Sequence, residues 1–333
     1  MTINPFKIYQ KWRDIQERIY ILEEKRHELE GKLSNEIQKN EKLRKRMMDY
    51  ESELRYRYYS LLPESQYPEE LKKLYYVRTG RRLNLDKPQT YNEKIQWFKL
   101  YGVSPQIRNL VDKYKVREYV RDKIGEKYLI PLLGVWNYPE DIDFSTLPEK
   151  FVIKANHGCQ YNYIVRDKSS LNRDAFIKTA DRWLTEDFAF RTLEMQYHNM
   201  QKYLIAEELL ENDVGEDIPD YKFFCFDGKP TFFWIDFNRY GNHKRNIYDM
   251  NWNLVDWIYD YDNIDTAVIK PEKWEEMVQV VRKLSEGFSH VRVDLYYAKR
   301  KVYFGELTFT TGSGFGKFIP DNADYMLGNM WKL

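Results

Sequence analysis

The sequence is poor in cysteine. Cys159 and Cys225 occur far apart, and neither has a nearby cysteine or a set of histidines at zinc spacing. Disulfide scaffolds and structural zinc modules are therefore excluded, and the reducing cytoplasm is the expected compartment. An excess of one charge is also missing, because 53 basic residues face 52 acidic ones. This balance argues against a surface that attracts nucleic acid. No apolar run approaches membrane-spanning length and no charged leader precedes an apolar segment, so we expect no transmembrane segment and no signal peptide.

The sequence has ample material for a folded core. Its 333 residues suffice for one large domain or two ordinary ones. Aromatic residues make up 17% of the chain and include 28 tyrosines. They cluster in runs such as KFFCF and TFFWIDF, which predict buried strands and not a surface for stacking bases.

The first sixty residues carry an apolar stripe among charged residues. The stripe consists of Trp12, Ile15, Ile19, Leu22, Leu29, Leu33, Leu43, Met47, Tyr50 and Leu54. Its alternating steps of three and four residues are the seam of a coiled coil, in which a polar residue such as Asn40 favours two strands. We predict a coiled-coil helix over residues 1–60 that self-associates or binds a partner coil through residues 12–54. The alternative is one long helix folded back on its own globular body. Pro63 and Pro68 are expected to break the helix.

From about residue 69 the pattern alternates between helices and strands, which predicts an α+β fold. Helices are expected at 91–102, 109–124, 174–184 and 272–286, from apolar periodicity and from glycines at their ends. Strands are expected in FVIKANHGCQYNYIV (as strand, turn, strand), YLIAEELL, YKFFCF, PTFFWIDF and residues 291–308. YLIAEELL ends in Glu207 and Glu208. These carboxylates could be solvated, or could accept hydrogen bonds from an adenine amino group or a ribose hydroxyl.

Lys154 ends a predicted strand and precedes a turn that contains Gly158. A lysine at a strand end, beside the backbone N–H groups of a short loop, is a typical place for a polyphosphate. The alternative is an ordinary solvated lysine. The segment GSGFGK at 312–317 is not a P-loop, because its spacing is one residue short and Phe318 stands where Ser or Thr would bind the metal. We interpret it as a loop that allows close approach of the backbone.

Asp294 and Glu306 lie on two strand-like segments joined by a turn at 298–301. Facing carboxylates repel each other, so a buried pair is costly unless a cation lies between them. Oxygen ligands alone indicate a hard ion, and Mg²⁺ on a nucleotide polyphosphate is the common case. The alternative is a pair of exposed hairpin charges that pair with Lys299 or Arg300.

The order of these features along the chain resembles the ATP-grasp superfamily. Lys113 in DKYKVREYV is followed by Lys154 in FVIK, the EELL strand end, RVD and GELT. The phrases YNEKIQWFKLYG, DKYKVREYV, YLIPLLGVW, FVIKANHG, RYGNHKRNIYD and FGELTF resemble its TupA-like branch, which is named for teichuronopeptide synthesis. The resemblance covers roughly residues 70–333. It implies a helical linker region at 61–110 and an ATP-grasp domain at 111–333, with subdomains at roughly 111–205 and 206–333.

The resemblance implies a role for each matching residue of the nucleotide site. Lys113 and Lys154 match the two lysines that hold the ATP phosphates. Glu207 and Leu209 match the linker segment that meets adenine. Asp220, in the DYKFF run, is similar in place to the acidic residue that bonds the ribose.

The resemblance also implies a metal site and a catalytic arginine. Asp294 and Glu306 match Mg²⁺ ligands, and Arg292 matches the arginine that stabilises the acyl phosphate or the tetrahedral oxyanion. The third metal ligand is usually Asn, and here it is Thr308. A hydroxyl can bind Mg²⁺ or hold one of its waters, so Thr308 is the third candidate ligand.

Two further departures concern the loop after Lys154 and the acceptor. Cys159 and Gln160 stand in that loop where small residues are usual. ATP-grasp ligases usually carry an N-terminal parallel-sheet domain that helps to bind the acceptor, but residues 61–110 show no strand pattern. The acceptor must therefore be held by another part of the chain.

A predicted basic loop between strands contains Arg239, His243, Lys244 and Arg245. We expect Arg239 and Arg245 to clamp a carboxylate or the γ-phosphate. The alternative is a solvated loop.

The implied function is an ATP- and Mg²⁺-dependent carboxylate–amine ligase that forms an amide through an acyl phosphate. Its substrates are expected to be a uronic acid or amino acid and an amine of a cell-surface polysaccharide precursor, such as a capsule, O-antigen or teichuronopeptide-like precursor. We expect a cytoplasmic protein that pathway partners recruit to the inner face of the membrane. One alternative is a glycosyltransferase of the same pathway, whose DxD pair would be DYD at 260–262. The other is a coiled-coil scaffold with a degenerate body.

Overall fold

The computed structural model describes residues 5–212, 218–237, 243–264 and 268–333. The chain divides into two units, Met1–Tyr58 and Tyr59–Leu333. The helices are α1 (Pro5–Ser60), α2 (Tyr67–Thr79), α3 (Tyr91–Tyr101), α4 (Pro105–Leu110), α5 (Val116–Ile124), α6 (Arg173–Thr185), α7 (Trp274–Ser285) and α8 (Asn322–Met330). None of the described helices combines the length and the apolar character needed to cross a bilayer.

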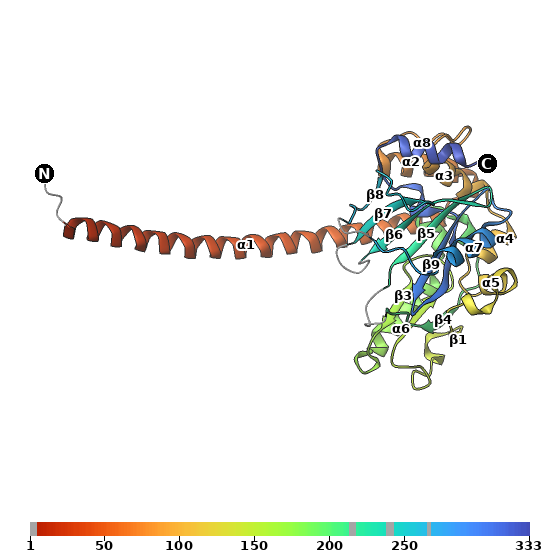
Figure 1. Ribbon diagram of the computed structural model, residues 1–333, viewed down its shortest axis with the longest axis horizontal. Coiled ribbons are helices and arrows are strands. Elements are labelled where there is room, and N and C mark those ends of the chain that lie inside the picture. The colour runs from red at the N-terminus through yellow and green to blue at the C-terminus, as the bar shows by residue number, and fades with distance from the viewer. Residues whose placement is uncertain (1–4, 213–217, 238–242, 265–267) are drawn as a thin grey trace. The chain divides into compact units, whose positions relative to one another are not determined.

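The first unit consists of α1, which Figure 1 shows as one continuous helix. Of the helix predicted for residues 1–60, Pro5–Ser60 is confirmed, and residues 1–4 lie outside the described residues. Every side chain from 21 to 48 is exposed, including Leu22, Leu29 and Leu33 of the apolar stripe. Association through this stripe stays a prediction.

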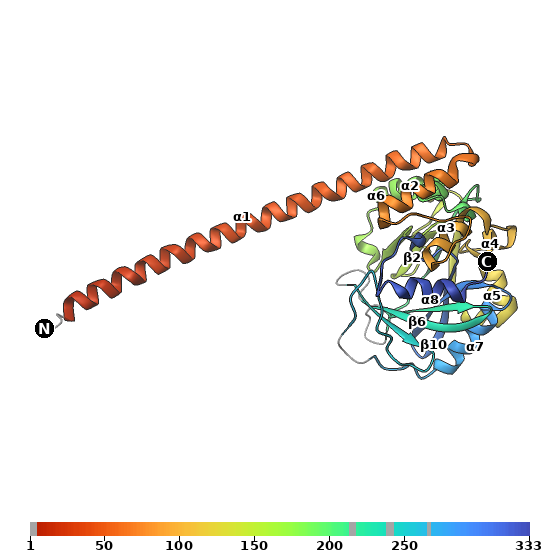
Figure 2. The ribbon, with the colours of Figure 1, turned by 90° about the horizontal axis from the view of Figure 1, so that it is seen from above.

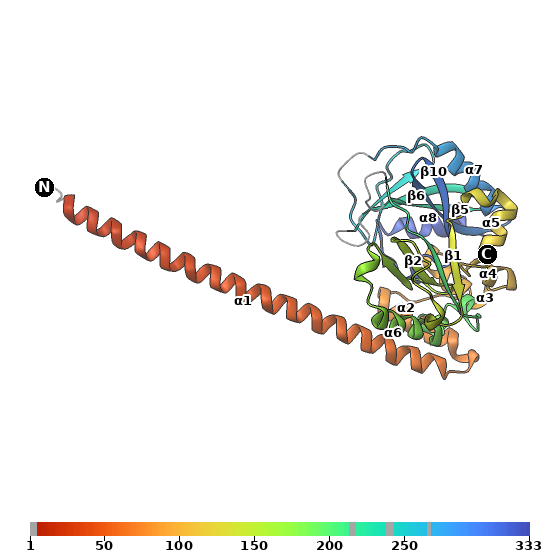
Figure 3. The same cartoon turned by 90° about the horizontal axis from the view of Figure 1, so that it is seen from below.

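The first sheet of the second unit has the strand order β1-β4-β2-β3 and is antiparallel throughout. Figure 3 labels its strands β1 and β2. Its strands are β1 (Leu132–Trp136), β2 (Phe151–Ala155), β3 (Asn162–Val165) and β4 (Leu204–Glu208). In β2, Phe151 and Ile153 face the core beneath α6, so Lys154 points to the opposite face, because successive side chains of a strand alternate. Ala206 in β4 likewise faces that core, and Glu207 faces away with Lys154. The alternation thus places both predicted site residues on one face.

The second sheet has the order β10-β9-β5-β6-β7 and is covered by helices on both faces (Figure 2). Its strands are β5 (Asp220–Phe226), β6 (Lys229–Phe237), β7 (Lys244–Asp249), β9 (His290–Ala298) and β10 (Lys301–Thr308). Helices α5 and α7 pack on one face, and α3 and α8 pack on the other, over Phe224 and Phe226. Asp220 and Lys222 lie on the same face as Phe224, further along β5, where they line a cavity. A third, two-stranded sheet pairs β8 (Ile258–Tyr259) with β11 (Phe318–Ile319).

The single helix predicted for residues 109–124 is wrong, because a turn at 111–115 separates α4 from α5. The carboxylate of Asp112 accepts hydrogen bonds from the backbone N–H groups of Tyr114 and Lys115 at 2.9 and 3.1 Å. The Nδ2 of Asn156 donates to the same carboxylate at 2.8 Å. These hydrogen bonds stabilise the turn. Lys113 therefore lies in a turn and not at the start of a helix.

Pro63 and Pro68 lie in different positions relative to the helices. The chain leaves α1 after Ser60 and before Pro63, as expected. Pro68, however, lies in the first turn of α2, where its missing N–H would have no helical partner in any case. The expectation that Pro68 breaks a helix is therefore wrong. Residues 61–110 are helical without strands, and α3 belongs to the core of the second sheet.

Candidate active site

A cavity of about 480 Å³ lies between the two sheets and is lined by residues of both. The first sheet contributes Val152 and Ile164 as apolar walls, and the second contributes Tyr296 and Phe304. The predicted residues that line it are Lys113, Lys154, Glu207, Leu209, Asp220, Arg245, Arg292, Asp294 and Glu306. Residues far apart in the sequence therefore converge on one space of the size that small-molecule ligands occupy.

Lys154 is paired inside this cavity. Its Nζ donates to Glu207 Oε2 at 2.6 Å across the β2–β4 pair. Arg117 Nη1 donates to Glu207 Oε1 at 2.8 Å, and its Nη2 donates to the Ile130 carbonyl at 2.9 Å. Glu207 thus holds two cations at the cavity wall. Arg117 was missed in the sequence, because it lies on a different element, ninety residues from Glu207.

Lys113 and Gly158 meet at the turn after β2. The Nζ of Lys113 donates to the Gly158 carbonyl at 2.6 Å. Gly158 has φ +68°, and a Cβ there would lie 2.5 Å from the Phe188 ring, so only glycine fits. Burial lowers the pKa of Lys113, because it disfavours the charged ammonium form. Lys113 therefore gives up its proton more readily than an exposed lysine does.

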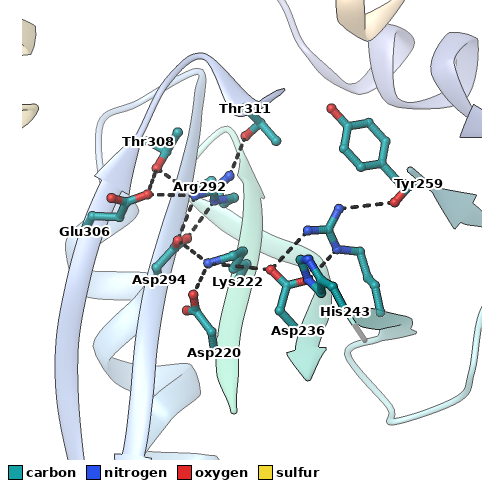
Figure 4. A network of polar contacts seen from close by, with 11 residues as sticks. Asp220, Lys222, Asp236, His243, Tyr259, Arg292, Asp294, Glu306, Thr308 and Thr311 are labelled. Carbon is teal, nitrogen blue, oxygen red and sulfur yellow. Dashed lines mark hydrogen bonds and ion pairs between the residues drawn. The ribbon is translucent and has the colours of Figure 1, made fainter. Parts of the chain in front are cut away.

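Arg292 lies between the two predicted metal ligands, as Figure 4 shows. Asp294 and Glu306 are register partners on β9 and β10, as predicted. Arg292 donates to both Asp294 oxygens at 2.7 Å and to Glu306 Oε1 at 2.8 Å. It also donates to Thr308 Oγ1 at 3.0 Å, while the Thr308 hydroxyl donates to Glu306 Oε1 at 2.7 Å. A cation between the two carboxylates is thus supplied by the protein itself.

Lys222 is a central residue that the sequence did not single out. Its Nζ donates to Asp220 Oδ2 and, at 2.9 Å, to Asp294 Oδ2, and it lies 3.9 Å from Asp236 Oδ2 (Figure 4). The signal was available in the DYKFF run, because Lys222 is two residues from Asp220 and hence on the same face of β5. Asp220 is therefore engaged with a lysine, and its binding of a ribose stays a prediction.

The predicted basic loop is partly a strand. Lys244 and Arg245 belong to β7, and Arg239 lies outside the described residues. Arg245 is buried and donates to Asp236 through Nε at 2.5 Å and Nη2 at 3.0 Å. His243 Nε2 lies 3.2 Å from Asp236 Oδ1. Arg245 thus neutralises a carboxylate of the protein, and its clamping of a substrate anion stays a prediction.

These contacts shift the pKa values of the acidic residues in opposite directions. Burial pushes the pKa of Glu306 upward, but the charges of Arg292 and Lys222 and the Thr308 hydroxyl outweigh it and hold that pKa at about 2. Burial also raises the pKa of Asp236, but Arg245 lowers it, and the resulting pKa is again about 2. For Asp294 burial dominates and raises the pKa. Glu306 is therefore the more firmly ionised of the facing pair.

The geometry fits a divalent cation that shares its ligands with a nucleotide. Among the described residues no three acidic, histidine or cysteine side chains converge as a complete metal site. Mg²⁺ is typically held by one or two carboxylates, with phosphate oxygens and waters as the other ligands. Asp294 and Glu306 meet that description. Thr308 orients Glu306 and Arg292 in the described state, and its role as a third ligand stays a prediction.

Comparison with known proteins supports one family. A family model described as TupA-like ATPgrasp matches residues 93–332. No curated protein matches the chain. Among solved structures, D-alanine–D-alanine ligase from Bacillus anthracis aligns with 17% identity over 70% of this chain and 72% of that chain, with a TM-score of 0.42. Its complex with ATP aligns with 15% identity over 60% and 54%, with a TM-score of 0.38. Phosphoribosylamine–glycine ligase from Thermotoga maritima aligns with 12% identity over 63% and 51%, with a TM-score of 0.39. The chain spans only about half the length of these last two structures, and likenesses this low carry no argument about activity.

Proposed function

The chain belongs to the TupA-like ATP-grasp family, and on this premise we propose that it is an ATP- and Mg²⁺-dependent ligase that joins a carboxylate to an amine. The observation that carries the proposal is the cavity between the sheets. It joins Lys113 and Lys154 on one side to Arg292, Asp294 and Glu306 on the other. Positioning and charge stabilisation are the main contributions that a protein makes to phosphoryl transfer.

The nucleotide would lie along the first sheet. The apolar side chains of Val152 and Ile164 offer a wall for the adenine ring, and Leu209 lies beside them at the end of β4. Lys154 would bind a phosphate by exchanging or sharing its bond to Glu207, which keeps Arg117 as a partner. Lys113 would bind a phosphate from the neighbouring turn, beside Gly158.

The second sheet would hold the reacting end of the nucleotide. When bound, Mg²⁺ on Asp294 and Glu306 would neutralise charge on the phosphate oxygens. Arg292 is oriented by these two carboxylates, and among the described residues its Nη1 makes only a long contact, of 3.4 Å, to Thr311 Oγ1. This group is therefore the donor best able to bind an oxyanion. Lys222 lies on the other side of Asp294 and adds a second positive charge.

The carboxylate substrate would be phosphorylated in this cavity to an acyl phosphate, from which the amine displaces phosphate to form the amide. The uronic acid or amino acid of a cell-surface polysaccharide precursor, as substrate, rests on the family resemblance alone. A glycosyltransferase has less support. Asp260 Oδ1 accepts from the Lys317 backbone N–H at 2.8 Å, and Asp262 pairs with Lys244 at 3.3 Å, so the two acids of the DYD run are engaged separately.

The test is calorimetric titration with ATP, with and without Mg²⁺. We expect Mg²⁺-dependent binding that is lost in Lys154→Ala and in Glu306→Ala. Lys150→Ala is the matched control, because Lys150 lies just before β2 and pairs with Glu211 outside the cavity lining. Binding of a UDP-sugar in place of ATP would favour a transferase, and binding of no nucleotide would favour a scaffold. Where ATP binds, ADP release is then screened with pairs of carboxylates and amines.

A further inference from the structure

A second cavity of about 350 Å³ adjoins the first and shares Lys113, Arg292 and Glu306 with it. Its own walls include Val111, Phe188, Glu194, Tyr197, Leu307 and Ser313. Since the shared residues are those expected to surround the reacting phosphate, anything bound in this second cavity would lie next to the acyl phosphate. It is therefore placed for the second substrate and not for the nucleotide.

Glu194 is the distinctive group of this cavity. Glu194 is 6% exposed to solvent. The carboxylate accepts hydrogen bonds from the hydroxyl groups of Thr192 at 2.7 Å, Thr310 at 2.6 Å and Ser313 at 3.0 Å. Within the described parts of the chain, no basic side chain forms an ion pair with it. Every other acidic residue that we assign to the active site has a lysine or arginine partner.

A buried carboxylate without a cation is costly, even when hydroxyl groups donate to it. Beside Glu194, the amide of Gln196 donates to Thr310 Oγ1 at 2.8 Å. The same amide lies 3.5 Å from Glu194 Oε1, so Gln196 contacts the carboxylate without lining the cavity. A carboxylate at the cavity wall that makes no ion pair in the described chain is complementary to an ammonium group, which is a cation with three donors.

The N-terminal helices build this cavity. Gln96 of α3 donates through Nε2 to the carbonyls of Ser313 and Gly314 at 3.0 and 2.7 Å. Lys99 of α3 donates to the Thr192 carbonyl at 3.2 Å. Helix α3 thus fixes both chain segments that present hydroxyl groups to Glu194. Helix α3 precedes residues 111–333, which the resemblance assigned to catalysis.

We propose that the second cavity binds the amine substrate, as a primary ammonium group held by Glu194. This inference rests on the proposed ligase function and adds the place and the charge of one substrate. The apolar walls formed by Val111, Phe188 and Leu307 suit a short carbon skeleton. Repulsion from Glu194 would disfavour a free carboxylate at the same position.

Cys159 permits a test that needs neither ATP nor the true substrate. It is an exposed cysteine that lines both cavities, whereas Cys225 is buried. The thiolate attacks a methanethiosulfonate at its sulfenyl sulfur, which forms a mixed disulfide and releases methanesulfinate. Labelling rates are compared for the cationic 2-aminoethyl and the anionic 2-sulfonatoethyl reagents.

The ratio of the two rates measures the preference of the cavity for an ammonium group, because the thiolate fraction cancels. We expect the cationic reagent to be favoured, and Glu194→Gln to lower the ratio by on the order of 10-fold. Glu194→Asp keeps the charge and should keep most of the preference. Glu286→Gln, an exposed acid paired with Lys123, controls for the change in net charge, and Cys159→Ser should abolish labelling.

Protection by a small amine gives a second measurement. Ethylammonium chloride should slow labelling by the neutral methyl reagent in the wild type and not in Glu194→Gln. An unchanged rate ratio in folded Glu194→Gln, or equal protection in both proteins, would overturn the proposal. Such a failure is distinct from failure of the ligase function, which would show as absent Mg²⁺-dependent ATP binding in the calorimetric titration of the wild type.

Discussion

Replacing Arg292 by alanine removes the cation that joins the two predicted metal ligands. Arg292 is 7% exposed and Asp294 is 1% exposed. The change deletes two bonds of 2.7 Å to Asp294 and one of 2.8 Å to Glu306. Asp294 then keeps only Lys222 among the cations within hydrogen-bond distance in the described chain. Removing one partner of a buried ion pair typically costs ~3–5 kcal/mol, because an uncompensated charge remains.

Stability and catalysis can be separated by measuring both. Urea unfolding, followed by tryptophan fluorescence, should show Arg292→Ala less stable by ~3–5 kcal/mol without Mg²⁺. Mg²⁺ should restore part of the loss, because Asp294 and Glu306 lose their internal cation and become better ligands for a divalent ion. The wild type should gain less. Turnover should fall by ~10²–10³-fold even at saturating Mg²⁺, since the oxyanion donor is absent.

The control is Arg282→Ala, because Arg282 is exposed on α7 and its loss should change stability by no more than ~0.5 kcal/mol. The reasoning would be refuted if Arg292→Ala were as stable as Arg282→Ala, or if Mg²⁺ stabilised the wild type and Arg292→Ala equally. Full turnover in Arg292→Ala would remove the arginine from the proposed mechanism.

Three further outcomes are expected. Burial lowers the pKa of Lys99 from 10.5 to about 7. Above pH 7 the unfolded chain therefore binds a proton that the folded chain lacks, and urea denaturation should show wild-type stability rising relative to Lys99→Met by ~1 kcal/mol per pH unit up to about pH 10; parallel pH curves would contradict this. Asp236 has its pKa lowered from 3.8 to about 2, mainly by Arg245 against the effect of burial. Its contribution of ~2 kcal/mol should be complete above about pH 4 and lost as the pH falls to about 2, so acid titration of stability should show the gap to Asp236→Asn closing in that window. Leu22→Ala with Leu29→Ala should lower the sedimenting mass while ATP binding survives, and an unchanged mass would remove the coiled-coil prediction.

Local alternation accounts for the parts of the site that the sequence predicted. Lys154 and Glu207 could be placed because each lies one residue before the end of a short strand whose preceding residues are apolar. Asp294 and Glu306 could be assigned to neighbouring strands because a tight hairpin joins these strands. Their direct pairing depends on a β-bulge between Phe304 and Glu306, without which Asp294 would face Gly305. For Lys154 and Glu207 the information lies within the strand itself, where the period of two decides which face a side chain occupies.

Contacts between distant segments account for what the sequence missed. Glu194 carries no motif, and its significance comes from hydroxyl groups more than a hundred residues away, at Thr310 and Ser313. The helix predicted for residues 109–124 is interrupted around Asp112, whose carboxylate accepts hydrogen bonds from Asn156 and from the backbone of the turn. No sequence pattern within the predicted helix indicates this interruption. The sequence predicted that Arg245 lies in a loop and clamps a substrate anion, whereas it lies in strand β7 and pairs with Asp236, which is nine residues away on β6.

The described state also explains why ATP and Mg²⁺ should depend on each other. The cations that would serve ATP are already paired: Lys154 with Glu207, and both Arg292 and Lys222 with Asp294. If a phosphate binds Lys154 alone, Asp294 stays neutralised, because Arg292 and Lys222 still pair with it. A divalent ion held by Asp294 and Glu306 would weaken their bonds to Arg292 and Lys222, and these two cations could then bind the phosphate. Each ligand thus removes part of the cost of binding the other, which is a coupling free energy between the two. Titration with ATP alone should accordingly give much weaker binding than titration with Mg²⁺ present.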